Sequence, residues 1–515
     1  MNTSDSQLVE ISTGLISGTA DENNDQIRIF RGIPFAEPPV GDLRWKPPQS
    51  AKPWEGVKEC TQNGNACPQK ILEGPFAQDF GEQNEDCLHL NIWTPATSTQ
   101  DKLPVMVWIY GGGFFQGSNA NETYDAVKLA EKGAVVVTIN YRIGLFGFLA
   151  HPWLSEESEH GISGNYGFLD QIHALKWVKE NTSSFGGDPE KVTIFGESAG
   201  GRSVCFLMVS PLTKGLFQRA IVQSGSLYRN VPHLKKAHQG FPSMEEEGAK
   251  LVEKTGCQSL SDLRNLNQEQ LLAAANTTTS PLLASPLTPW KNPGNDYICG
   301  PIVDDYALTE DHMERFERGE YNNVPLIIGW NNDEAMLFFK TFPDKPEIFQ
   351  KMIRVPYPHS YETISRFYPV SDSVSLIEVI NRFMTDAVWM APADQMAAVH
   401  VHSQPKTFLY LFSKIRTSVP ALEFLKAFHG AEIRYVFGNL GEGQHQPDEA
   451  DKKLMETMMQ YWVNFAESGD PNGNGLPQWP VYDERDQLLE LGAEIKVISH
   501  PSRELCEIFM KNVKK

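Results

Sequence analysis

The stretch that most constrains the fold of this chain is Val192–Gly201, where a short apolar run leads into the pattern Gly-x-Ser-x-Gly. Residues 192–195 are β-branched or aromatic and predict a buried strand, while the largely apolar residues 203–209 predict a helix. Ser198 would then lie on a tight turn between them, with its hydroxyl at the positive end of the helix. A glycine turn without chemistry is the alternative, because five-residue patterns recur by chance.

A nucleophilic serine also needs donors that can stabilise an oxyanion. Residues 103–110 form a continuous apolar run, which is typical of a strand buried on both faces, and they lead into Gly111, Gly112 and Gly113. Backbone N–H groups in such a loop are not covered by side chains and can turn toward a developing negative charge. The loop does not fit a phosphate site, because no Gly-Lys-Ser/Thr follows it. An ordinary glycine turn stays open as the other interpretation.

Apolar strand patterns alternate with helical patterns, which favours an α/β layer fold with a mostly parallel central sheet. Two helix-rich stretches, about 230–320 and 345–405, are expected as excursions from the sheet, so that residues 1–515 form one domain. Residues 9–18 and 26–31 are expected to pair as a hairpin. The other strands are predicted at 89–94, 103–110, 134–141, 192–195, 219–223, 323–329 and 407–413, the last of the buried ones, with short strands near Val481 and Leu488.

The order of elements limits the choice of base and acid. In α/β-hydrolases the serine is followed by the acid and then by the histidine, each in a loop after a strand. Three histidines follow residue 413. His445 lies in a polar loop and His500 in a charged tail, so both are expected to be solvated, whereas His429 lies between apolar residues. A satisfied core histidine is the other interpretation of His429. For the acid, the residues alone do not decide between Asp333 and Glu334.

Composition argues against several classes of partner. The chain carries 45 basic and 65 acidic residues, and a net charge of −20 disfavours nucleic acids and anionic membrane surfaces. No apolar run approaches the length of a membrane span, and the polar first ten residues show no signal peptide. The chain has neither C-x-x-C nor H-E-x-x-H, so neither a metal nor a cofactor is expected.

Eight motifs carry a resemblance to a known family, and they extend over nearly the whole chain. They are Gly32–Ala36, Asn84–Ile92, Tyr110–Phe114, Phe195–Gly201, Gln223–Gly225, Asn332–Glu334, His429–Glu432 and Gly469–Asn472. With these motifs the chain resembles the type-B carboxylesterases, α/β-hydrolases that include cholinesterases and bacterial para-nitrobenzyl esterases. His151–Ser155 and Ser163–Gly167 are similar to the bacterial branch in particular.

The resemblance implies hydrolysis of carboxylic esters through a serine acyl-enzyme, without a cofactor, on a small-molecule substrate. The oligomeric state stays open, with a monomer favoured. The same chemistry on amides, carbamates or a bulky natural-product ester is the alternative. A non-catalytic adhesion protein on this fold is a further one, although such members typically lose the serine or the histidine. The residues implied are the triad Ser198, Glu334 and His429, the oxyanion donors Gly112, Gly113 and Ala199, and the nearby hydroxyl of Ser224.

Two further expectations concern the pocket and the cysteines. Phenylalanines of the glycine loop and of the stretch after Glu334 are expected to wall an apolar pocket, although ordinary core packing is the other interpretation of Phe338 and Phe339. The resemblance also implies a disulfide between Cys67 and Cys87, which favours a periplasmic or secreted protein. A cytoplasmic location stays open, because no signal peptide is visible. The phenylalanines are Phe114, Phe115, Phe338 and Phe339.

Overall fold

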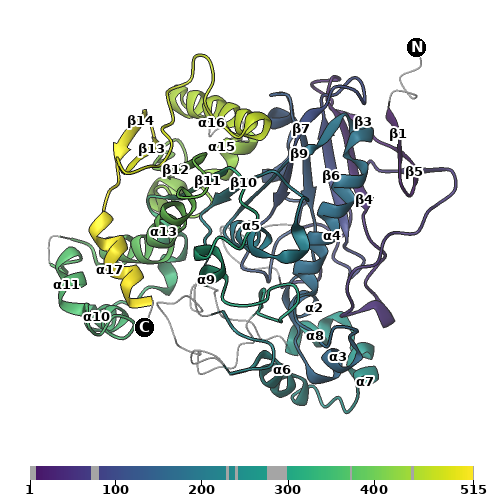
Figure 1. Ribbon diagram of the computed structural model, residues 1–515, viewed down its shortest axis with the longest axis horizontal. Helices are drawn as coiled ribbons and strands as arrows, with labels where there is room; N and C mark the ends of the chain where they lie inside the picture. The colour runs from purple at the N-terminus through teal and green to yellow at the C-terminus, as the bar shows by residue number, and fades with distance from the viewer. Residues whose placement is uncertain are drawn as a thin grey trace.

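An eleven-stranded mixed sheet forms the centre of the computed structural model (Figure 1). The structure describes residues 7–70, 80–227, 231–237, 242–274, 299–371, 374–441 and 446–513. The strand order is β14-β13-β12-β11-β10-β9-β7-β8-β6-β4-β3. The strands of this sheet are β3 (Thr19–Ala20), β4 (Arg28–Pro34), β6 (His89–Thr94), β7 (Leu103–Ile109), β8 (Val135–Ile139), β9 (Gly187–Glu197), β10 (Arg219–Gln223), β11 (Leu326–Asn331), β12 (Thr407–Phe412), β13 (Gln487–Leu491) and β14 (Ile495–Ser499).

The middle of the sheet is parallel, as the sequence predicts. Every neighbouring pair from β8 through β7, β9, β10, β11 and β12 to β13 is parallel, while the pairs at the two ends are antiparallel. Parallel strands all end at one edge, so the loops that follow β9, β11 and β12 meet there. Those three loops carry Ser198, Glu334 and His429.

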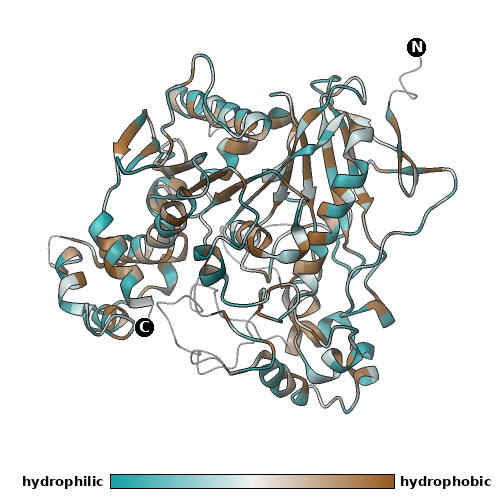
Figure 2. Ribbon diagram, in the orientation of Figure 1, coloured by the Kyte–Doolittle hydropathy of each residue, from teal (hydrophilic) through white to brown (hydrophobic). Residues whose placement is uncertain are grey.

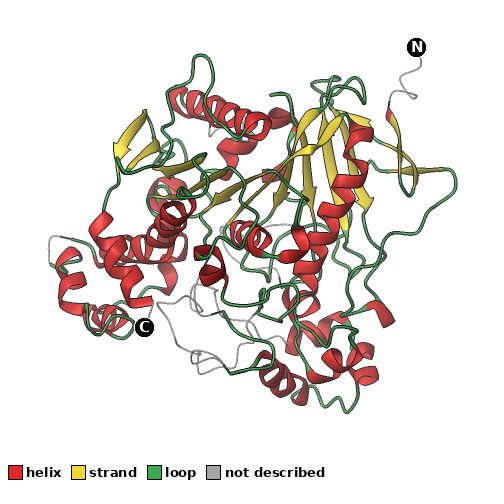
Figure 3. Cartoon of the chain, viewed as in Figure 1, coloured by secondary structure: helices red, strands yellow, loops and turns green. Residues whose placement is uncertain are grey.

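Helices flank the sheet (Figure 3). The described helices are α1 (Val127–Ala130), α2 (Gly144–Phe148), α3 (Pro152–Glu157), α4 (Tyr166–Asn181), α5 (Ala199–Val209), α6 (Met244–Glu253), α7 (Leu260–Asn265), α8 (Gln268–Ala274), α9 (His312–Glu317), α10 (Pro346–Arg354), α11 (Tyr361–Phe367), α12 (Leu376–Thr385), α13 (Ala391–His400), α14 (Pro420–Leu425), α15 (Ile433–Phe437), α16 (Glu449–Ser468) and α17 (Arg503–Val513). Helices α6 to α9 and α10 to α13 form the two predicted excursions. Within the described ranges, no helix is long and apolar enough to cross a membrane.

The core lies between the sheet and these helices. All residues of β8, β11 and β12 are buried, as is β7 after its first residue, which explains why their sequences are apolar apart from Thr138, Asn331 and Thr407. Figure 2 shows hydrophobic residues concentrated on the central strands and hydrophilic ones along the outer helices. Helix α5 packs on β9 and β10, and α16 packs on β7 and β9. The nucleophile turn is therefore held between rigid layers.

Two sequence predictions about strands are wrong in part. Residues 9–18 do not form one strand, because the chain turns back at Gly14, whose φ is +143°. Strands β1 (Leu8–Ile11) and β2 (Gly14–Ser17) pair with each other and, through β5 (Val57–Glu59), form a separate small sheet. Of the predicted hairpin, only the antiparallel pairing of β3 with β4 is formed. The strand predicted near Leu488 forms as β13 and is itself largely buried, so residues 407–413 are not the last buried strand, and no strand forms at Val481.

Candidate active site

Ser198 lies on the predicted turn, at the first residue before helix α5. Its backbone has φ +57° and ψ −121°, a conformation that residues with a side chain rarely adopt. The flanking glycines explain how the turn closes. A Cβ on Gly200 would lie 1.9 Å from the carbonyl oxygen of Ile109, and one on Gly196 would lie 2.6 Å from the same atom. Strand β7 and helix α5 can therefore approach only across glycine.

Ser198, His429 and Glu334 are brought together in one continuous chain of contacts. His429 Nε2 lies 2.7 Å from Ser198 Oγ, and His429 Nδ1 lies 2.6 Å from Glu334 Oε2. The other oxygen of Glu334 accepts the backbone N–H of Asn331 at 2.7 Å, and the carboxylate is fully buried. Both carboxylate oxygens are thus bonded, which fixes the histidine ring between acid and serine.

The structure also separates the two candidate acids. Asp333 faces away from the histidine: its Oδ1 accepts from Asn381 Nδ2 at 3.0 Å, and its Oδ2 accepts from Asn332 Nδ2 at 3.0 Å. Oδ2 also accepts the backbone N–H of Ala427 at 3.4 Å. Asp333 therefore joins β11 to the loop before His429 and leaves the imidazole to Glu334.

The glycine loop that follows β7 lies next to Ser198. A Cβ on Gly111 would lie 3.1 Å from Ser198 Cβ, so the loop backbone passes directly beside the hydroxyl. Gly112 and Gly113 have φ values of +95° and +65°. In the described part of the chain, the N–H groups of Gly112, Gly113 and Ala199 donate to no protein acceptor. Three unused donors beside a nucleophile are what an oxyanion site requires.

A second buried carboxylate, which the sequence did not single out, also faces the histidine. Glu197 Oε1 lies 3.2 Å from His429 Nε2, and the residue is 5% exposed. Burial raises the pKa of Glu197 to about 8, helped by the nearby carboxylates Glu432 and Glu334. Burial acts against a charged imidazole, but the carboxylates of Glu197 and Glu334 outweigh it and raise the pKa of His429 to about 9. The two groups titrate as a coupled pair.

Two aromatic rings pack against the histidine, Trp389 from the excursion at 345–405 and Phe338 from the 3-10 helix η7 (Glu334–Thr341) that follows β11. The rings of Trp389 and Phe338 have centroids 5.3 and 5.6 Å from that of His429, and they stack on each other at 6.4 Å. Trp389 lies in a single π-helical segment, η8 (Asp386–Met390), between α12 and α13. Trp389 could not be predicted from the sequence, because residues 387–391 are apolar at every position and show no periodicity that would orient a ring.

The other predicted pocket residues have different surroundings. Phe114 is buried with φ +64° and packs edge-on against Phe148. Phe339 contacts Phe424 rather than the histidine. Ser224 is buried and also has a positive φ, of +49°. Phe114 is a core residue, whereas Phe339 is only partly buried and its neighbour Phe424 is 51% exposed, so the core-packing interpretation does not describe Phe339.

The remaining histidines and the cysteine pair also differ from expectation. His445 lies outside the described residues. His500 is not solvated: its side chain is fully buried, because helix α17 and strand β11 enclose it. Cys67 and Cys87 are both thiols in this structure, so the predicted disulfide is not formed. They are neighbours nonetheless, since a hydrogen bond to Cys67, together with burial, raises the pKa of Cys87.

Known proteins share this architecture along the whole chain. Residues 5–509 match the model of the carboxylesterase family. A para-nitrobenzyl esterase of Bacillus subtilis (strain 168) is 35% identical over 97% of this chain and 97% of its own length. A fumonisin B1 esterase of Sphingopyxis macrogoltabida is 34% identical over 93% of this chain and 86% of its own.

Comparison with solved structures leads to the same family. A PNB esterase structure superimposes with a TM-score of 0.80 at 33% identity, covering 98% of this chain and 100% of the other. Its fold and the sheet described above are those of the α/β-hydrolases, as the resemblance implied. Family match, relatives and structural neighbours agree over nearly every residue. The chain therefore belongs to the carboxylesterase family and is a serine carboxylesterase, an enzyme that hydrolyses carboxylic esters.

Proposed function

We propose that the enzyme cleaves esters through an acyl-enzyme on Ser198, with His429 as the base and Glu334 as the acid that orients it. The observation that carries the proposal is the unbroken pair of contacts, 2.7 Å from Ser198 Oγ to His429 Nε2 and 2.6 Å from His429 Nδ1 to Glu334 Oε2. The whole chain, residues 1–515, works as one domain and as a monomer, with the excursions at 230–320 and 345–405 walling the site.

The reaction proceeds in two halves. His429 Nε2 takes the proton of Ser198 Oγ while the oxygen attacks the ester carbonyl carbon. The carbonyl oxygen becomes negative and is held by the N–H groups of Gly112, Gly113 and Ala199. The tetrahedral intermediate expels the alcohol, which receives the proton from His429, and Ser198 stays acylated. Water then attacks the acyl group, again with His429 as the base, and releases the acid.

The two aromatic rings beside His429 indicate which class of substrate the site favours. The rings of Trp389 and Phe338 pack at a tilt against that of His429, so an apolar acyl or alcohol group finds apolar surface close to the reacting carbonyl. We infer small-molecule esters with an apolar group as the main substrates. A bulky natural-product ester is the second candidate, and it is favoured by one observation: a relative 34% identical is named a fumonisin B1 esterase.

A substrate panel separates these candidates. We would measure kcat/KM for p-nitrophenyl esters of increasing acyl length, a matched anilide, a carbamate and a branched polyol ester. A preference for the simple esters supports the first candidate, and a preference for the polyol ester supports the second. Faster turnover of the anilide or the carbamate would overturn both in favour of another acyl transfer.

The nucleophile is tested with Ser198→Ala. We expect kcat on a short-chain ester to fall by about 10³-fold or more, as in other triad knockouts. Ser203→Ala is the matched control: Ser203 lies on the same helix, is buried, and accepts a hydrogen bond from Gln171 Nε2 at 3.0 Å. An organophosphate should label the unmodified protein and the control once each at Ser198, and should leave Ser198→Ala unlabelled. Undiminished turnover in Ser198→Ala would disprove the assignment.

The two neighbouring thiols support a proposal about the compartment. We propose that Cys67 and Cys87 are oxidised to a disulfide in a periplasmic or secreted protein, since such bonds persist in oxidising compartments. Support comes from their closeness, since Cys67 and burial together raise the pKa of the Cys87 thiol. Peptide mapping without reductant, on protein from an oxidising host, should recover one linked peptide pair. Two free thiols from that host would instead favour the cytoplasm.

A further inference from the structure

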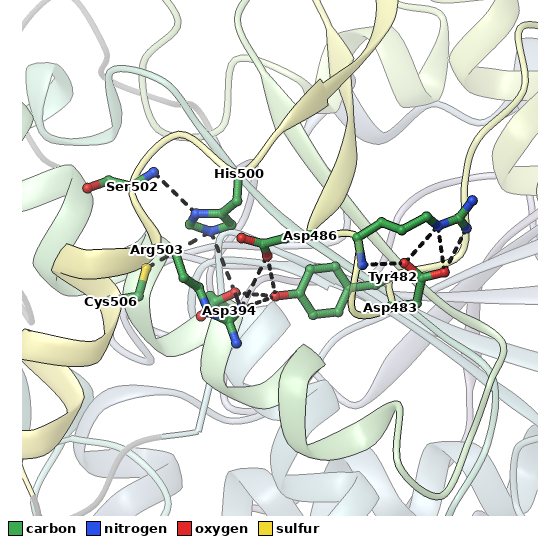
Figure 4. A network of polar contacts seen from close by, with 9 residues as sticks. Asp394, Tyr482, Asp483, Asp486, His500, Ser502, Arg503 and Cys506 are labelled. Carbon is green, nitrogen blue, oxygen red and sulfur yellow. Dashed lines mark hydrogen bonds and ion pairs between the residues drawn. The ribbon is translucent and has the colours of Figure 1, made fainter.

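A buried polar cluster joins helix α17 to helix α13, about one turn after Trp389 (Figure 4). It lies apart from the reacting groups, and no step of the proposed reaction uses it. We call it the Asp394 cluster. Its members come from α13, from the segment before β13, and from the C-terminal end of the chain. They are Asp394, Tyr482, Asp486, His500, Arg503 and Cys506.

Asp394 is the hub of the cluster. Its Oδ1 accepts from Tyr482 OH at 2.6 Å and from Arg503 Nη1 at 3.0 Å, and the residue is 4% exposed. Arg503 Nη1 also donates to Asp486 Oδ1 at 3.2 Å. Breaking such a pair leaves a buried charge uncompensated, which is far more costly than losing a surface ion pair. The cluster therefore ties α17 firmly to α13.

The cluster is complete without a cation, although His, Cys and Asp donors come within 4.8 Å of one another. His500 Nδ1 accepts the backbone N–H of Ser502 at 3.2 Å, so the neutral ring carries its proton on Nε2, the atom that faces Asp394. A ligand nitrogen must instead be free of its proton. The positive charge of Arg503 already compensates Asp394. The geometry points to a mechanical role.

That role is indicated by what lies next to the cluster. Helix α13 follows directly on the π-helical segment η8, in which the N–H of Ala391 donates to the carbonyl of Asp386 five residues earlier. π turns are rare and strained relative to α turns, so contacts outside the helix must hold them. A return to α-helical spacing would rotate Trp389 about the helix axis and away from His429.

A second contact holds the segment at its other end. Tyr368 OH donates to Asp386 Oδ2, on the first residue of η8, at 2.6 Å. The ring of Phe383, on the preceding helix α12, packs edge-on between Tyr368 and Phe509 of α17, with centroids 5.3 and 6.0 Å away. The π segment is thus fixed before and after Trp389, and α17 takes part in both contacts.

We propose that Tyr368 and Asp394 are positioning residues for ester hydrolysis, which hold the π segment so that Trp389 stays packed on His429. The inference rests on the proposed role of His429 as the base. A tightly packed imidazole keeps its alignment with Ser198, and a loosened one loses it, so the effect falls on kcat more than on substrate binding.

The first test compares Tyr368→Phe and Asp394→Asn with the parent enzyme on p-nitrophenyl acetate. We expect kcat to fall about three- to tenfold while KM changes by less than about twofold. Glu507→Gln is the control, since among the described residues Glu507 pairs only with Lys511, on the exposed side of the same helix, α17. Tyr368→Phe removes a single hydroxyl, so it decides the question even if Asp394→Asn fails to fold.

A double-mutant cycle with Trp389→Ala separates positioning from general destabilisation. If the two residues act through Trp389, then Tyr368→Phe and Asp394→Asn change kcat by less than about 1.5-fold in the Trp389→Ala background, while their effect on Tm persists. An unchanged kcat in the folded single variants, or an equal loss in both backgrounds, overturns the inference. If Ser198→Ala is inactive but the effects in the double-mutant cycle are additive, only the positioning role of Tyr368 and Asp394 is rejected. An active Ser198→Ala would reject the proposed site itself.

Discussion

At the scale of single residues, the carboxylates in and beside the site differ in what they contact. Glu334 is hydrogen-bonded to His429 and orients it in the proposed reaction, whereas Glu197 lies 3.2 Å from the nitrogen that faces Ser198. Asp333, the neighbour of Glu334, is turned to Asn381 and Asn332. Each carboxylate therefore has a separate measurable effect.

The first prediction concerns the two adjacent acids. Glu334→Gln should reduce kcat much more than Asp333→Asn, because only Glu334 accepts the Nδ1–H of His429 and stabilises the imidazolium that forms. The measurement is steady-state kinetics on a neutral ester, with circular dichroism to verify folding. A folded Asp333→Asn that is the more damaged of the two would show that the acid has been misassigned.

The second prediction concerns pH. His429 must be neutral to act as a base, and the nearby carboxylates raise its pKa to about 9. We therefore expect kcat/KM to rise with pH and to reach half its maximum above pH 6.5, since the ordinary pKa of histidine is about 6.5. Glu197 is the largest cause that raises this pKa. Glu197→Gln removes its charge, so the midpoint should move to lower pH. Asp333→Asn serves as a control that does not touch the ring, and a midpoint that stays or rises in Glu197→Gln contradicts the electrostatic account.

At the scale of elements, the junction of β7, β9 and α5 decides whether the serine is presented. Gly200 is the second residue of α5, where helix propensity alone would make alanine better than glycine by about 1 kcal/mol. The gap to β7 reverses that preference, because a Cβ there would lie 1.9 Å from the backbone oxygen of Ile109.

The third prediction follows from this contact. Gly200→Ala should destabilise the protein by about 3 kcal/mol or more, since backbone atoms must move to admit the methyl group. It should also reduce kcat, because α5 moves with Ser198. Gly473→Ala is the comparison: its Cβ meets the side-chain nitrogen of Asn464 and not a backbone atom, so the methyl group costs at most the hydrogen bonds of that nitrogen to Pro471 and Asn472. Urea unfolding of both variants measures the difference, and equal stabilities would mean that the junction relaxes easily.

Sequence patterns predicted the elements whose own residues indicate that they are buried. The continuous apolar run 103–110 was enough for β7, and the strand–glycine–helix pattern was enough for the turn at Ser198. Patterns could not predict features created by distant contacts. His500 lies in a polar stretch and becomes buried only through Trp330 and α17, and Asp333 and Glu334 differ only in which way their side chains turn. The division of residues 9–18 depended on a single glycine turn.

At the scale of the whole molecule, oxidation state is the variable most open to test. Cys67 and Cys87 lie 20 positions apart, and linking them restricts the unfolded chain.

The fourth prediction is therefore that oxidised protein exceeds reduced protein in free energy of unfolding by about 3 kcal/mol. Denaturant unfolding with and without reductant measures this difference. In a Cys67→Ser, Cys87→Ser variant the difference should vanish, while the other five cysteines remain as an internal control. A difference that survives in this variant would assign the effect to another cysteine.

The separation of the site residues along the chain bears on how the enzyme is made. Ser198 and His429 are 231 residues apart, and the acid lies between them on a third loop. During translation the serine turn emerges from the ribosome long before its base, so the nascent enzyme must remain inert until the strand before residue 429 joins the sheet. Catalytic competence then arrives in a single late step of synthesis, and any chain released before that step carries an exposed serine with no means of using it.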